Sequence, residues 1–283
     1  MYLFSYFKTD DESFYLAVSE DGYAWKEWNG GSPVLQSMDT GGKIIRDPFV
    51  MEDKAGRFHA VWTDGWEGSS IGYAWSDDLL RWEGYKSLPV MASVAGTRNC
   101  WAPEMMFDEA EGAYRIFWSS TVAEPGIGKV RDHRIWSVLT DDFERFTAPQ
   151  LYFDPGYNVI DATVADLGEQ YLMLFKDERG GNDPDTDYKA IRSCSFGKHA
   201  AGRPEPTCVS GLITPPLSEG PTLYEVMNGS GEREWIMLYD LFHFREYGAM
   251  RSKDLVHWEN VTHLMTFLPD RRHGSVIKVK HHL

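Results

Sequence analysis

The sequence has few cysteines and no apolar run long enough to span a membrane. Its three cysteines, Cys100, Cys194 and Cys208, form no Cys-x-x-Cys pair, so we expect buried thiols rather than disulfides or a zinc site. Residues 1–7 are too short a segment for a signal peptide and lack its basic flank. We therefore expect a cytoplasmic protein, or a periplasmic or secreted one if a leader has been removed.

Positive charge is also scarce. Asp and Glu total 43 against 28 Lys and Arg, which gives a formal net charge of −15. Nucleic acids and anionic membranes are bound through basic surfaces, so neither is an expected partner. A neutral oligosaccharide or polysaccharide fits this charge better, and an aromatic content of 14% is enough both to fill a core and to offer stacking surfaces to sugars.

What the sequence does contain is a repeat. Five polar residues stand at or just before short β-like runs: Asp47, Glu104, Asp161, Glu219 and His273. The intervals between successive members are 57, 57, 58 and 54 residues. A period of this length is typical of radial or solenoidal arrays. Residues at one phase of a radial array converge on its axis, so we expect these four acids and the histidine to meet in one site.

A second motif recurs between these positions. It consists of a Ser or Thr, an Asp two residues later and an aromatic residue four positions after the Asp. Four copies begin at Ser19, Ser76, Thr140 and Ser252, and a degenerate fifth falls near Ser195. We interpret it as a turn in which the Asp accepts hydrogen bonds from backbone N–H groups while the aromatic residue opens the next strand.

Each period holds four strand-like segments separated by turn signals. In the first period they cover residues 47–51, 57–63, 71–75 and 81–83. Helical periodicity is not sustained anywhere in the sequence. Four short strands per unit are typical of the blade of a β-propeller.

The two ends of the chain complete the blade count. After His273 there is room for one strand, whereas the segments 2–7, 14–19 and 25–28 lack an inner partner. We therefore predict an all-β fold, a five-bladed β-propeller whose last blade is closed by strands from both termini, which leaves no free edge. Since no linker divides the sequence, residues 1–283 are expected to form a single catalytic domain.

Three of the repeated residues have the chemistry of a hydrolytic site. Asp47, Asp161 and Glu219 would line one funnel, where their mutual repulsion should raise at least one pKa and leave an acid and a base at the same pH. Hydrolysis of a glycosidic bond requires that division, because one carboxylic acid protonates the leaving oxygen while a carboxylate activates water or attacks carbon. One such acid alone would be interpreted as a turn residue; three in one phase favour catalysis.

The strings around these residues are recognisable as a set. They are Arg46-Asp47-Pro48-Phe49-Val50, Trp101-Ala102-Pro103-Glu104, Ile160-Asp161-Ala162-Thr163-Val164, Ser218-Glu219-Gly220-Pro221-Thr222 and Arg272-His273-Gly274-Ser275-Val276. In this order and spacing, over essentially the whole chain, the sequence resembles glycoside hydrolase family 43. The resemblance implies that Asp47 is the general base, that Glu219 is the general acid, and that Asp161 tunes and orients that acid. It also implies inversion of configuration, with the base and acid carboxyls about 6.5–9.5 Å apart.

Further residues are candidates for substrate binding. Arg46 could hold a substrate hydroxyl or keep the base ionised, with a salt bridge as the alternative, and Trp101 could stack on a sugar or pack in the core. Glu104 could accept a sugar hydroxyl, although its position varies in the family, and Lys176 could reach the pocket from the end of a second strand. His273 is expected to line the sugar pocket. In the family, that position sometimes approaches a calcium ion through water, but one His with scattered acids is a poor ligand set. We expect no required cofactor and leave a structural calcium ion near His273 open.

The resemblance implies an inverting exo-glycosidase that removes α-L-arabinofuranosyl or β-D-xylosyl units from plant-type polysaccharides or oligosaccharides. The alternatives are a β-D-galactofuranosidase or an endo-acting arabinanase of the same fold, and, in another class, a non-catalytic carbohydrate-binding propeller. Invertase-like enzymes need an N-terminal Asn-Asp-Pro nucleophile motif, which does not precede Arg46. A sialidase needs an arginine triad, and its aspartate turns have a different spacing.

Overall fold

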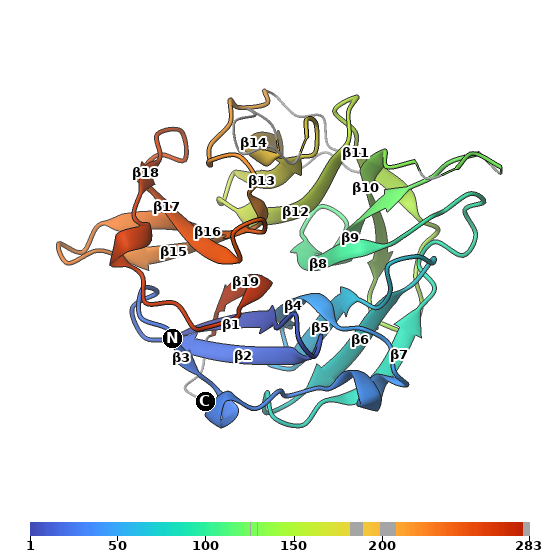
Figure 1. Cartoon of the computed structure of the whole chain (residues 1–283), viewed down its shortest axis with the longest axis horizontal. Helices are drawn as coiled ribbons and strands as arrows, with labels where there is room; N and C mark the ends of the chain where they lie inside the picture. Colours follow the sequence, from blue (N-terminus) through green and yellow to red (C-terminus); the bar gives the residue numbers. More distant parts are fainter. Residues whose placement is uncertain (125, 129, 182–188, 199–207, 280–283) are drawn as a thin grey trace.

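The computed structural model describes residues 1–124, 126–128, 130–181, 189–198 and 208–279. Within these ranges the chain forms nineteen β-strands and three short 3-10 helices, Asn29–Gly31, Ser37–Thr40 and Thr262–Leu264, and no α-helix. The strands form five antiparallel sheets around a central axis (Figure 1). The prediction of an all-β, five-bladed propeller is confirmed. No helix among the described residues is long and apolar enough to cross a membrane.

In four of the blades the strands follow chain order from the axis outwards. The first blade contains β4 (Arg46–Glu52), β5 (Phe58–Thr63), β6 (Ile71–Ser76) and β7 (Glu83–Leu88). The second contains β8 (Trp101–Asp108), β9 (Ala113–Thr121), β10 (His133–Thr140) and β11 (Gln150–Phe153). The described part of the third contains β12 (Val159–Asp166), β13 (Gln170–Asp177) and β14 (Ala190–Gly197). The fourth contains β15 (Glu219–Met227), β16 (Arg233–Leu241), β17 (Glu246–Ser252) and β18 (Glu259–Asn260).

Both ends of the chain build the last blade, as predicted. Its inner strand is β19 (Arg272–Lys278), which pairs with β1 (Tyr2–Phe7) and is followed outwards by β2 (Phe14–Ser19) and β3 (Lys26–Glu27). The first two N-terminal strands have the predicted bounds, and the third is shorter than predicted. Antiparallel pairing of β1 with β19 closes the ring, so the geometry at the axis depends on both termini.

The aspartate turns form as predicted. In the copy at Ser76, the Asp78 carboxylate accepts hydrogen bonds from the N–H groups of Leu80 (2.9 Å) and Arg81 (2.7 Å), and the Ser76 hydroxyl accepts that of Leu79 (2.9 Å). The copies at residues 19, 140 and 252 show the same bonds. Because this turn contains residue 81, the outer strand runs from Glu83 to Leu88, not over 81–83 as predicted.

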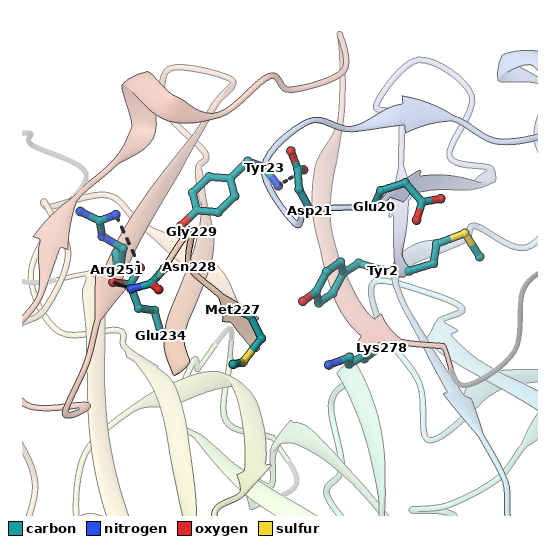
Figure 2. Close-up of a pocket in the computed structure, with 11 residues that line it drawn as sticks. Tyr2, Glu20, Asp21, Tyr23, Met227, Asn228, Gly229, Glu234, Arg251 and Lys278 are labelled. Carbon is teal, nitrogen blue, oxygen red and sulfur yellow. Dashed lines mark hydrogen bonds and ion pairs between the residues drawn. The ribbon is translucent and has the colours of Figure 1, made fainter. Parts of the chain in front are cut away.

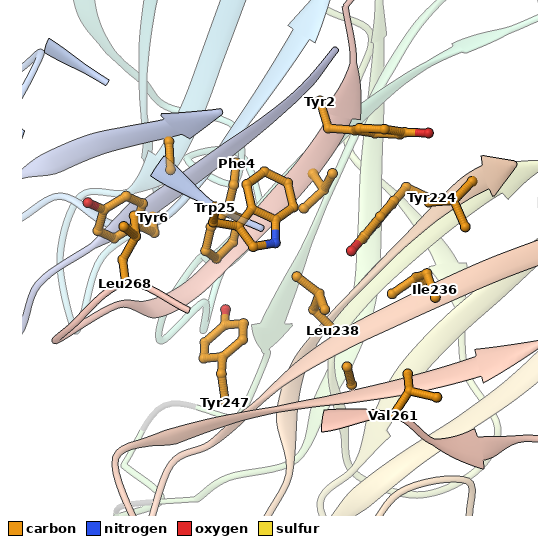
Figure 3. Packing of buried hydrophobic residues seen from close by; sticks show 14 of the residues in the cluster. Tyr2, Phe4, Tyr6, Trp25, Tyr224, Ile236, Leu238, Tyr247, Val261 and Leu268 are labelled. Carbon is orange, nitrogen blue, oxygen red and sulfur yellow. The ribbon is translucent and has the colours of Figure 1, made fainter. Parts of the chain in front are cut away.

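Apolar side chains pack between neighbouring blades. Between the fourth and last blades, Phe4 lies against Trp25 and Tyr247, with ring centroids 5.4 and 5.7 Å apart, and Trp25 meets the edge of Tyr224 at 6.2 Å (Figure 3). Burying one large apolar side chain stabilises a fold by about 1.5–3 kcal/mol, so such clusters hold the blades at fixed angles. Of the cysteines, Cys100 and Cys194 are buried free thiols as expected, whereas Cys208 is exposed.

Every inner strand carries the same β-bulge near its start. At each bulge, two residues of the inner strand lie opposite one residue of the second strand. The five bulges lie between Arg46 and Phe49, between Trp101 and Glu104, between Ile160 and Thr163, between Glu219 and Thr222, and between Arg272 and Ser275. The single opposing residue is always a fully buried aromatic: Trp62, Trp118, Phe175, Tyr239 and Tyr6. The second bulge residue is Pro48, Pro103 and Pro221 in three blades. Proline fits there because an unpaired bulge residue needs no N–H group.

The first bulge residues are the equivalent positions of the five blades: Asp47, Ala102, Asp161, Gly220 and His273. The first four have left-handed φ angles of 52°, 46°, 55° and 56°, which aspartate and glycine tolerate better than most residues. The prediction that all five repeated polar residues share one phase is therefore wrong for two of them. Glu219 stands one residue before its bulge position and Glu104 two residues after, because loops of unequal length shift the repeat.

Candidate active site

The bulges lie at one end of the inner strands, and hydrogen bonds between blades hold them together. Thr63 ends the second strand of the first blade, and its hydroxyl accepts the N–H of Ala102 in the next blade at 2.8 Å. Ser119 in the second blade accepts the N–H of Asp161 in the third at 3.1 Å. In both cases, the polar residue that directly follows the buried aromatic of a second strand holds the bulge of the neighbouring blade by a hydrogen bond.

In the remaining blades, side-chain carboxylates make the hydrogen bonds that connect one blade to the bulge of the next. The Asp161 carboxylate accepts the N–H of Gly220 at 3.1 Å, which ties the third blade to the fourth. Asp240 in the fourth blade accepts the N–H of His273 in the last blade at 3.0 Å. Residues far apart in sequence therefore meet in a small rigid ring, as the spacing predicted.

Asp47 is held in an environment that favours its charge. Its Oδ2 accepts a hydrogen bond from Thr63 Oγ1 at 2.7 Å, and its Oδ1 lies 3.3 Å from Nδ1 of His273. Burial alone would raise the pKa of Asp47, but the His273 charge and hydrogen bond, with help from Arg46 and Thr63, lower it below its ordinary value. An ionised carboxylate at neutral pH is what a general base requires.

His273 bridges two carboxylates. Its Nδ1 lies 3.3 Å from Asp47 and 3.8 Å from Asp161. Its ring packs so closely on Gly220 that an added Cβ there would lie 2.5 Å from the imidazole carbons. Burial works to lower the pKa of His273, but attraction to Asp161 and Asp47 outweighs burial and raises it to about 10. The imidazole is therefore charged at neutral pH, where it offsets the charge of Asp47 and any charge on Asp161.

Asp161 differs from Asp47 although both occupy the same bulge position. Burial raises the pKa of Asp161 to about 7, with a further contribution from the Glu219 charge, and His273 offsets only part of this. Two acids in equivalent positions thus have pKa values shifted in opposite directions. One carboxyl with a raised pKa was predicted, and Asp161 is one such group.

Glu219 lies among cations. Its Oε2 is 2.9 Å from Nζ of Lys176, and its Oε1 is 3.8 Å from an Nη of Arg272. Lys176 is buried, and its Nζ also lies 2.5 Å from Glu178 and 4.3 Å from the ring centroid of Phe242. The structure thus places Lys176 against protein carboxylates, where it fixes Glu219.

The three acids differ in how far a ligand can reach them. The Glu219 side chain is 21% exposed and that of Asp47 15%, whereas that of Asp161 is only 5% exposed. Asp47 and Glu219 can therefore touch a bound substrate. Asp161 is positioned to act on its neighbours through Gly220 and His273.

Arg46 and Glu104 are both engaged within the protein. Arg46 pairs with Glu12 at 3.0 Å, and its guanidinium lies 4.5 Å from the ring centroid of Trp66. The salt bridge that we kept as an alternative for Arg46 is therefore present. Glu104 is buried beside Thr163, and burial raises its pKa to about 8.

Trp101 lies at the edge of the ring, one residue before its bulge. Its indole N–H donates to the carbonyl of Trp66 at 3.1 Å, and the two rings meet edge to face with centroids 6.1 Å apart. Both line a groove of about 680 Å³ beside the site. Trp101 therefore faces a cavity and is not a simple core residue.

The sequence analysis missed several contributors to the site, among them Thr63, Asp240, Glu178, Ser119 and Arg272. Asp240 is fully buried, lies 2.8 Å from Nε of Arg272, and has a pKa that burial raises to about 6. A signal for three of them exists, because Thr63, Ser119 and Asp240 each directly follow the buried aromatic of a second strand. No comparable pattern marks Glu178.

The donor set does not match a calcium site. Among the described residues, no three His, Cys, Asp or Glu side chains are grouped so that they could hold a metal ion. The Nδ1 of His273 is directed at two carboxylates, and calcium prefers six to eight oxygen ligands. We derive no step through a metal.

A second hollow, of about 640 Å³, lies at the other end of the strands (Figure 2). Tyr2, at the start of β1, and Lys278, at the end of β19, are partners in the sheet register and line it side by side, with Lys278 Nζ 6.0 Å from the Tyr2 ring centroid. Two of its three acids have structural partners: Asp21 caps the turn before Trp25, and Glu234 accepts a hydrogen bond from Asn228. The bulge residues are at the opposite ends of these strands.

We expect His273→Gln to lower the free energy of unfolding at pH 7 by about 3–5 kcal/mol, because it leaves Asp47 and Asp161 buried without their shared cation. The folded-state pKa of His273 is raised to about 10, so its contribution is complete below about pH 6.5 and disappears as the pH rises through 10. Denaturant unfolding followed by tryptophan fluorescence should show the deficit shrinking from pH 6.5 to 10. A deficit independent of pH would mean that the imidazole is neutral.

Comparison with known proteins adds a family-level match. The model of a glycoside hydrolase family 43-related domain, described as "Probable glycosyl hydrolase domain", matches residues 1–282. An α-L-arabinofuranosidase of Bifidobacterium longum subsp. longum is 30% identical over 201 residues, which correspond to 60% of this chain and 18% of that protein. The chain thus aligns with about a fifth of the length of this curated relative.

Solved structures share the fold at low sequence identity. A β-xylosidase/α-arabinofuranosidase of family 43 from a compost microbial metagenome superposes with a TM-score of 0.56 and 14% identity, covering 76% of each chain. An endo-arabinanase of the same family from Bacillus licheniformis gives a TM-score of 0.54 and 14% identity, covering 77% of each chain. At these identities the likeness concerns the fold.

Proposed function

Because the chain belongs to the family 43-related glycosyl hydrolases, we propose that it hydrolyses α-L-arabinofuranosyl or β-D-xylosyl linkages from the ends of oligosaccharides, with inversion of configuration. One observation carries the proposal. The two acids that a ligand can reach, Asp47 and Glu219, come from different blades and are connected through the buried Asp161 and the half-buried His273. An inverting glycosidase needs two such carboxyls, one acting as a base and one as an acid.

The roles follow from the surroundings of each acid. Asp47, ionised by His273, takes a proton from a water molecule that attacks the anomeric carbon. Glu219 gives a proton to the departing oxygen on the other side of the sugar, and Lys176 and Arg272 hold its carboxyl in place. Asp161 positions this acid by binding the N–H of Gly220, the next residue in the chain. The bond from the anomeric carbon to oxygen breaks as the bond to water forms.

The choice of sugar is based on the relatives. The α-L-arabinofuranosidase of B. longum is a curated protein whose sequence matches part of this chain, and the metagenomic enzyme of similar fold is a β-xylosidase/α-arabinofuranosidase. We therefore place arabinofuranose first and xylose second. The endo-arabinanase shares the fold, so an endo-acting enzyme is the alternative to be tested.

The test is a panel of nitrophenyl glycosides carrying α-L-arabinofuranose, β-D-xylose and β-D-galactofuranose, with the first product anomer identified by NMR. We expect the arabinofuranoside to react fastest and to release the β-anomer first. An α-anomer as the first product would contradict inversion. Cleavage of linear arabinan without release from any of the three glycosides would replace the exo-acting proposal by the endo-acting one.

A further inference from the structure

The groove beside the site differs in charge from the rest of the molecule. The chain carries a formal charge of −15, yet Arg98 and Arg131 both line this groove, against one acid, Glu67. Burial lowers the pKa of His133, which also lines it, to about 4, so this histidine is neutral at pH 7. The groove is therefore a local cationic site on an acidic protein.

Neither arginine is neutralised within the part of the chain that the structure describes. The hydrogen bonds of the Arg98 guanidinium go to the backbone carbonyls of Glu124 and Ile127, at 3.4 and 2.8 Å, and neither arginine has a carboxylate partner among the described residues. The exposed Arg131 guanidinium lies 5.6 Å from the ring centroid of Trp101. Elsewhere Arg134, Arg179 and similar residues are paired with acids. The two groove arginines thus keep their capacity to bind an anion.

The groove also has surfaces for a sugar ring. Trp66 is 54% exposed and stands perpendicular to Trp101, so the two indoles form a corner. Apolar C–H faces of sugars pack on such rings. Trp66 also contacts Arg46, the residue before Asp47. A sugar in this corner would therefore neighbour the unit held at the acids.

We infer that this groove binds a sugar carrying a carboxylate, a uronic acid residue, next to the glycosyl unit that is cleaved; the inference rests on the proposed function. Aromatic faces would hold the ring, and Arg131 and Arg98 would bind the carboxylate. Arginine suits this role because its planar fork can bind a carboxylate through two parallel hydrogen bonds. The expectation of a neutral substrate came from overall composition, which does not reveal a local cluster.

The test compares two oligosaccharides that differ only in charge. The probes are a xylo-oligosaccharide bearing one glucuronic acid and the same molecule after reduction of its carboxylate to a hydroxymethyl group. Binding is measured by titration calorimetry with the Asp47→Asn protein, so that neither probe is cleaved. We expect the acidic probe to bind about tenfold more tightly, which is the effect of one charge-assisted hydrogen bond. Arg131→Gln should bring the ratio of the two affinities close to one, and Trp66→Ala should weaken the binding of both probes alike.

Arg57→Gln is the matched control. Arg57 also lies over an indole, that of Trp75 at 3.9 Å, but just before the start of β5, at the far end of the strands from the bulges. It should leave the ratio unchanged. If Arg131→Gln destabilises the loop, the affinity ratio is measured instead in the Asp47→Asn protein that retains Arg131, at about 0.05 M and about 0.5 M NaCl. Salt should suppress the preference.

Two outcomes would overturn the inference: equal affinity for both probes, or a ratio that neither Arg131→Gln nor salt reduces. Either would show that the groove arginines do not select the carboxylate. Since the readout is binding, a failure here leaves the hydrolysis panel untouched. Conversely, if none of the nitrophenyl glycosides is cleaved but the acidic probe binds more tightly, the proposed reaction is rejected and the inference about the groove stands.

Discussion

Replacing Asp47 by asparagine is expected to lower kcat on the arabinofuranoside by about 10²–10⁴-fold, which is the usual contribution of a general base, and to change the melting temperature little. The amide keeps the size of the side chain and can still contact Thr63, but it cannot take a proton from water. His273 retains Asp161 as its partner, so the ring of bulges stays intact. The measurement combines steady-state kinetics with a thermal melt of the same preparation.

A matched control removes an acid of the same blade that is distant from the ring. Asp77 is exposed and pairs with Arg57 at the far end of the strands, so Asp77→Asn should keep full activity. An Asp47→Asn protein that is folded and turns over within a few-fold of the parent would remove Asp47 from the mechanism. A large loss in both variants would point to a general effect of charge.

The blade architecture was predictable because its signals are local. The aspartate turn is encoded within seven residues, and in the four full copies Asp21, Asp78, Asp142 and Asp254 accept the expected hydrogen bonds from backbone N–H groups. The closure of the ring was predictable by counting strands at the two ends. The length of an outer strand such as β7 was not, because it depends on where the turn ends.

The exact register of the site could not be predicted, because it depends on pairing between strands. A bulge is defined by which residues lie opposite each other, and a shift of one or two positions separates Glu219 and Glu104 from the position of Asp47. Similarly, Asp161 and Asp47 sit in equivalent positions but differ in pKa. Burial and the Glu219 charge raise the pKa of Asp161, whereas His273, Arg46 and Thr63 together lower that of Asp47. Such differences in surroundings need coordinates.

Replacing Glu219 by glutamine should separate substrates by their leaving group. A sugar leaving group of high pKa needs a proton as the bond breaks, so we expect kcat/KM on an arabino-oligosaccharide to fall by about 10²–10⁴-fold. A dinitrophenyl leaving group departs as a stable anion, so its hydrolysis should fall far less. The glutamine can still contact Lys176 and Arg272, which keeps the geometry. The measurement is the ratio of the two losses.

The control for this ratio is Glu178→Gln, which alters the other carboxylate of Lys176 while leaving Glu219 in place. If Lys176 then shifts, binding and orientation should suffer for both substrates alike, since no proton donor has been removed. A loss that depends on the leaving group in Glu219→Gln but not in Glu178→Gln would identify the donor. Equal losses on both substrates in Glu219→Gln would instead place the acid elsewhere in the ring, where the buried Asp161, with its pKa raised to about 7, is the next candidate.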